Sequence, residues 1–236
     1  MTMARSASGR APTAVRTDRL TKAGLAATIL IVFAASTAEL INHGFDLKIQ
    51  MLDSGSDGGV SGVLVDIAIA TAAASAWLVT ARMRSARPVA AILAVLLTFL
   101  AVDQVLALHN HIPHWLAFYL PLLLASFACL VALARGIPWL RRAGAGQGAG
   151  SAVIERLIGS GLALLVVSFL LHLFGEHLMA SLGLSNPAGW AYQVKLVIKH
   201  GTEVAGWLLI ALGLFRLGLP GRRHSGQDGG RTMVRA

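Results

Sequence analysis

The sequence predicts an all-α, polytopic integral membrane protein, a six-helix transmembrane bundle with both termini in the cytoplasm. Of its 236 residues, 56% are hydrophobic and 13% are charged, whereas about a quarter of the residues in a typical soluble domain are charged. The mean hydropathy is +0.68. The apolar residues form runs whose length is close to the roughly 20 residues that a helix needs to cross a bilayer. This composition excludes a soluble enzyme, a secreted disulfide scaffold and a disordered tail protein.

The basic residues predict the orientation. The net charge is +9, and most basic residues fall between the apolar runs in four groups: Arg5–Lys22, Arg82–Arg87, Arg135–Arg156 and Arg216–Arg235. Basic loops resist translocation, so groups on alternate sides of successive runs place those segments inside the cell. The same distribution argues against nucleic-acid binding. We expect a multi-pass protein of a bacterial-type cell (inner) membrane, with the lipid bilayer as its main partner. A homo-oligomer or a partner in a membrane complex is compatible with this pattern.

Three domains follow from these patterns. Residues 1–21 read as a disordered basic tail, 22–217 as the six-span transmembrane domain and 218–236 as a second basic tail, and the glycines of residues 143–151 predict a flexible cytoplasmic linker. Pro121 should kink the fourth span. The six expected spans are Lys22–Asn42, Gly59–Thr80, Pro88–His109, Trp115–Ala134, Ile154–Leu182 and Trp190–Leu217.

One alternative concerns the first span. Its basic start, its apolar stretch and the small residues Ser36, Thr37 and Ala38 are also typical of a cleaved signal peptide. Cleavage there would leave five spans. We favour retention of the span, because the basic region is long and the segment that follows is not a soluble domain.

Ionisable residues inside the spans are the main functional signal. A charge at membrane depth costs a few kcal/mol, so it should face the bundle interior and be paired. In the sixth span Tyr192, Lys195, Lys199 and Glu203 recur at three- and four-residue intervals, which places them on one helix face. In the fifth span Ser168, His172 and Glu176 do the same. These faces predict a shared, outward-facing polar cavity.

A cation is the expected ligand of this cavity. Five embedded carboxylates against two lysines require protons, protonated histidines or a bound cation. One candidate is a divalent metal (Zn, Fe or Mn), which imidazole and carboxylate ligands suit. The spacing, however, does not match the Glu-x-x-His pattern of di-metal bundles, and the lysines would repel a metal ion. The candidate metal ligands are Glu39, His43, Asp66, Asp103, His172, Glu176, His200 and Glu203.

Several other functions stay open. Lys195, Lys199 and Glu203 form a candidate ion-pair network or proton relay, and His172 with His200 is the one deep histidine pair for a haem. A metal-dependent membrane-embedded enzyme acting on a lipid would use the same residues, although no hydrolase motif identifies a catalytic residue. A structural or accessory subunit would use its polar groups to lock the helices together. The sequence therefore favours binding or moving a cation, either a divalent metal or protons.

Overall fold

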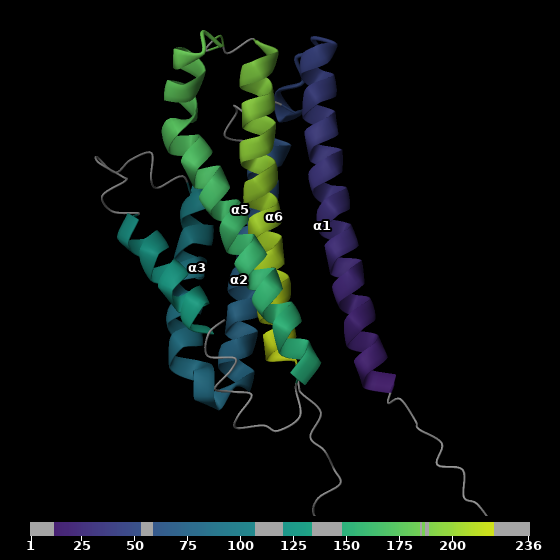
Figure 1. Ribbon diagram of the computed structural model, residues 1–236, viewed down its shortest axis with the longest axis vertical. Helices are drawn as coiled ribbons and strands as arrows, with labels where there is room; N and C mark the ends of the chain where they lie inside the picture. Colours follow the sequence, from purple (N-terminus) through teal and green to yellow (C-terminus); the bar gives the residue numbers. More distant parts are fainter. Residues whose placement is uncertain are drawn as a thin grey trace, which may run out of the picture.

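The computed structural model describes residues 12–52, 59–106, 120–133, 148–184, 186 and 189–219. The regular secondary structure of this part of the chain is all helical, which confirms the all-α prediction (Figure 1). Five long helices and the shorter helix Leu120–Leu133 are joined by connections that include two 3₁₀ turns, η1 (Gln50–Leu52) and η2 (Arg84–Ala86). The long helices are α1 (Pro12–Gly44), α2 (Val60–Arg82), α3 (Arg87–Leu106), α5 (Gly148–Ser181) and α6 (Trp190–Gly218).

Two helices begin well before the expected spans, and the fourth expected span is described only in part. Helix α1 begins at Pro12, ten residues before the predicted span, and proline suits a first helical turn because that turn needs no N–H donor. Helix α5 begins at Gly148, so the last residues of the expected linker are helical. Of the fourth predicted span, the described part is Leu120–Leu133. The predicted kink at Pro121 stays a prediction, because the residues that precede this helix lie outside the described ranges.

The five long helices are each long and apolar enough to cross a membrane, and their directions require one more crossing. Helices α2 and α3 are antiparallel, because the four residues 83–86 connect them. Helix α6 is antiparallel to α1, since Gly44 lies beside Trp190, and to α5, since Gly175 lies beside Lys195. Helix α2 is parallel to α6, since Gly218 at the end of α6 lies beside Leu78 near the end of α2, so α1, α3 and α5 run the same way, as Figure 1 shows. Because α3 and α5 run the same way, the chain between them returns across the bundle, and the part of this connection that the structure describes is the apolar helix Leu120–Leu133.

The first residue of α1 and the last of α6 consequently lie at the same end of the bundle (Figure 1). We call this the inner end, because most of the described basic residues gather there and basic residues favour the cytoplasmic side. The opposite end, where α1 ends and α6 begins, is the outer end. The basic residues of the inner end whose side chains the structure describes are Arg19, Lys22, Arg82, Arg84, Arg87, Arg156 and Arg216.

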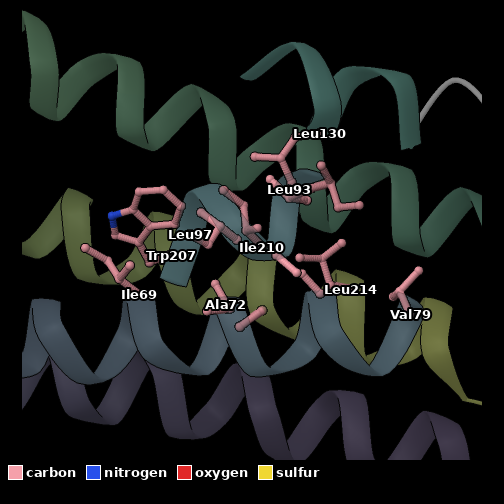
Figure 2. Packing of buried hydrophobic residues seen from close by; sticks show 14 of the residues in the cluster. Ile69, Ala72, Val79, Leu93, Leu97, Leu130, Trp207, Ile210 and Leu214 are labelled. Carbon is pink, nitrogen blue, oxygen red and sulfur yellow. The ribbon is translucent and has the colours of Figure 1, made fainter. Parts of the chain in front are cut away.

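Helix α6 is the centre of the bundle, with α1, α2 and α5 packed against it and α3 packed against α2. Small residues allow these contacts: Ala68, Ala72 and Ala76 of α2 recur every four residues and are fully buried. Such stripes let membrane helices approach closely, and the dispersion contacts of that approach stabilise the bundle. Figure 2 shows the resulting apolar core, to which Leu130 of the short helix also contributes.

Helix α1 lies at the periphery. Its side chains Ile29, Leu30 and Phe33 are 67–69% exposed in the isolated chain. In a bilayer, apolar side chains on such a surface face lipid tails, which are as apolar as the residues themselves. Helices α1 and α2 both pack against α6.

Candidate functional site: a polar cluster in the outer half

The predicted polar stripe of α6 faces α5 and α2 in the outer half of the bundle. Lys195 is 9% exposed, and its ammonium Nζ lies 4.1 Å from the centre of the Tyr192 ring. A cation over an aromatic face is attracted by the ring quadrupole, most strongly where water is excluded. Gly175 of α5 makes room for this lysine, because a Cβ there would lie 3.1 Å from Lys195 Cδ. The buried ammonium of Lys195 thus lies over the Tyr192 ring, and the lysine side chain packs against α5 at Gly175, which has no side chain.

Lys199, one turn further along α6, contacts a histidine. Its Nζ lies 3.3 Å from Nε2 of His200. The second ring nitrogen of His200, Nδ1, is buried and has no hydrogen-bond partner among the described residues. The charged side chains that act on this imidazole are Lys199, Lys195 and, from α5, His172. His200 therefore sits in a surrounding with an excess of positive charge.

Glu203 provides the opposite charge, another turn toward the middle of the bundle. The Ser168 hydroxyl of α5 donates a hydrogen bond of 3.5 Å to Glu203 Oε2. Lys199 and Asp66 of α2 act on this carboxylate electrostatically, with opposite signs. Glu203 is thirteen residues from the start of α6, which is about 20 Å at 1.5 Å per residue. The polar stripe thus reaches the middle of the membrane.

A second polar contact links α1 and α2 to the same stripe. The Ser61 hydroxyl donates a 3.5 Å hydrogen bond to Glu39 Oε2, and Glu39 is 5% exposed. Glu39, Ser36, Ser61 and His200 line one small cavity. The space in it that is open to the centre of a water molecule is about 10 Å³, which is room for about one water. The cavity brings a carboxylate of α1 near the imidazole of α6.

We call these residues the outer polar cluster. It joins groups from α1, α2, α5 and α6 that lie far apart in the sequence. Its members are Glu39, Ser61, Asp66, Ser168, His172, Lys195, Lys199, His200 and Glu203.

Other candidate residues lie at the edge of the cluster or outside it. The His43 ring packs edge-on against Trp190, with ring centres 4.8 Å apart, at the outer rim. Glu176 acts electrostatically on His172 and is exposed on α5. Asp103 is 1% exposed and lies on α3, which packs against α2 rather than against α6. Within the described ranges no three His, Cys, Asp or Glu side chains are close enough to hold one metal ion.

Three contacts of the outer polar cluster are not evident from the sequence pattern. The pairing of Lys199 with His200 joins neighbours in the chain, whereas helical spacing suggests Glu203, one turn away, as the partner of Lys199. Ser61 and Gly175 belong to the site only because of how the helices pack. A glycine in one span that could face a lysine in another is the one sequence feature that could have indicated the Gly175 contact. No protein-family model, curated protein or solved structure matches the chain.

Proposed function

We propose that this integral membrane protein binds protons reversibly in the outer polar cluster and that proton binding changes the packing of α6 against its neighbours. One observation carries the proposal: the 3.3 Å contact between Lys199 Nζ and His200 Nε2. An ammonium group only donates hydrogen bonds, and a doubly protonated imidazole has no acceptor nitrogen. The contact therefore holds one proton between two bases and is broken when the pair takes up a second one.

The surroundings of the pair determine where a second proton goes. On the positive side lie Lys195 and His172, and a charged His200 would be repelled by Lys199 at contact distance. The carboxylate that shares the small cavity with this ring is that of Glu39. An imidazolium at residue 200 is stabilised by turning from the lysine toward a carboxylate. Such a turn moves a half-buried ring on the central helix, so it alters packing.

Protons fit this cluster better than a metal ion does. Lys199 occupies one of the two imidazole nitrogens of His200, and the positive charges of Lys199 and Lys195 repel a cation from the other. Metal ligands must be deprotonated and free to bind, whereas a proton requires a single basic nitrogen. Stoichiometric zinc, iron or manganese in the purified protein would instead favour the metal-site interpretation.

Binding is also better supported than passage across the membrane. The polar groups extend from the outer end to Glu203, while the inner half of the described core contains apolar side chains such as Val79, Ile210 and Leu214 (Figure 2). A chain of ionisable groups marks a proton route, and here that chain covers the outer half. We therefore propose a membrane protein that binds protons and responds to them, rather than one that carries them across the membrane.

Amide hydrogen exchange in lipid nanodiscs tests this function. After correction for the intrinsic pH dependence of exchange, the outer half of α6 should exchange more at pH 5 than at pH 8, because the broken contact loosens it. His200→Gln should abolish that difference. His177→Gln is the matched control, since His177 is exposed on α5. An undiminished pH response in His200→Gln would overturn the proposal.

A further inference from the structure

A groove in the inner half of the bundle separates α1 from α2. It has a volume of about 260 Å³, and α6 forms its floor. The groove exists because α1 and α2 both pack against α6. The lining residues are Gly24, Ala27, Thr28 and Ile31 of α1, Thr71 and Ser75 of α2, and Leu208, Ala211, Leu212 and Phe215 of α6.

The lining is apolar in practice, although three of its residues carry hydroxyl groups. Each hydroxyl donates to a carbonyl one turn earlier in its own helix: Thr28 to Gly24 at 2.9 Å, Thr71 to Ile67 at 2.7 Å and Ser75 to Thr71 at 2.8 Å. Such bonds occupy the single hydroxyl proton of each side chain. The groove therefore offers its occupant hydrocarbon surface and no free hydroxyl donor.

The inner mouth of the groove is positively charged. Arg216 follows Leu212 by one turn of α6, and Arg19 and Lys22 precede Gly24 on α1. Among the residues of the inner end whose side chains the structure describes, seven are basic and one, Glu155, is acidic. Long basic side chains at the ends of membrane helices extend to the headgroup level, where they attract anionic lipids.

We propose that the groove binds one acyl chain of an anionic phospholipid, whose phosphate lies among the basic side chains of the inner mouth. An apolar channel that ends at a cationic rim matches the two parts of such a lipid. The eight helical residues from Gly24 to Ile31 extend about 10 Å along the helix axis, which is part of the length of an acyl chain. The bound chain fills the space between α1 and the rest of the bundle and so fixes α1.

Thermal unfolding of the purified protein in detergent tests this site, with phosphatidylglycerol and phosphatidylcholine of identical acyl chains as probes. A ligand that binds the folded state raises the unfolding midpoint, so phosphatidylglycerol should raise it several degrees more than phosphatidylcholine. Ala27→Phe fills the groove and should remove this difference, while Ala26→Phe, on an exposed neighbour outside the lining, should keep it. Thr71→Phe fills the groove from the opposite wall and serves if Ala27→Phe does not fold.

The charge at the mouth is tested in the same way. Arg216→Gln should reduce the advantage of phosphatidylglycerol, and Arg84→Gln, at the same end but in η2, should not. Equal stabilisation by both lipids, or an undiminished difference in both groove-filling variants, would overturn the proposal. Native mass spectrometry checks for a different occupant. If the unmodified protein is a dimer and Ala27→Phe makes it a monomer, the groove binds a second copy of the chain, and the lipid proposal is wrong.

Discussion

The hydroxyl of Ser168 on α5 donates to the carboxylate of Glu203 on α6 across the centre of the bundle, at 3.5 Å. This contact joins two residues that are 35 positions apart in the chain. It also places a hydrogen-bond donor beside the deepest acidic group of the outer polar cluster. A buried acceptor that loses its donor costs free energy, so the contact holds the carboxylate in place.

Removing that donor gives the first prediction. Ser168→Ala should lower the free energy of unfolding by about 1 kcal/mol, within the range measured for hydrogen bonds between membrane helices. Ser160→Ala, at an exposed position on the same helix, should cost less. Unfolding in detergent with a mild denaturant measures both. Equal costs would show that the Glu203 contact contributes no stability.

The ring under Lys195 gives the second prediction. Tyr192→Phe keeps the aromatic face and should leave stability almost unchanged, whereas Tyr192→Leu removes the quadrupole and should cost about 1 kcal/mol. The two variants are compared by their thermal unfolding midpoints. If the phenylalanine and leucine variants lose the same stability, the cation–π contact does not stabilise the lysine.

Two glycines of α5 allow a matched test of helix packing. A Cβ on Gly161 would lie 2.7 Å from the Gly206 carbonyl oxygen of α6, whereas a Cβ on Gly159 meets nothing within 4 Å. Gly161→Ala should therefore destabilise by about 1–3 kcal/mol, the usual cost of forcing packed elements apart. Gly159→Ala should be neutral or slightly stabilising, because alanine favours the helix. Similar unfolding midpoints for the two variants would contradict the observed approach of α5 and α6.

The sixth crossing can be tested by cysteine labelling in a Cys129→Ala background. The direction of α5 places Leu184 at the outer end and Gly148 at the inner end. A membrane-impermeant maleimide should label Leu184→Cys in intact cells. It should label Gly148→Cys and Arg84→Cys after permeabilisation alone. Labelling of Gly148→Cys from outside would show that residues 107–147 do not return across the membrane.

Much of the fold was predictable from the sequence, because lipid leaves a chain few choices. Apolar runs of sufficient length must be helical, and basic residues such as Arg82 and Arg216 mark one side. The exact helix starts were not predictable: α1 begins at Pro12 and α5 at Gly148, because helices extend beyond the apolar stretch into polar residues.

The site was predictable in part. Spacing on one helix placed Tyr192, Lys195, Lys199 and Glu203 on the α6 stripe, and the contact of Lys195 with Tyr192 joins two of these residues. The partners across helices were not predictable, because helix order, rotation and depth decide them. Asp103 is an example: it is buried like a site residue, yet it lies on α3, which packs against α2.

The nitrogen-15 spectrum of His200 tests the central claim most directly. The protein is labelled at histidine in lipid nanodiscs, and the His200 signals are identified by their loss in His200→Gln. If Lys199 donates to Nε2, the neutral imidazole must carry its hydrogen on Nδ1. The account predicts that tautomer at pH 8, proton uptake at acidic pH, and uptake at a less acidic pH in Lys199→Met, because the repelling neighbour is gone. A neutral ring with its hydrogen on Nε2, or an uptake that Lys199→Met leaves unchanged, would contradict it.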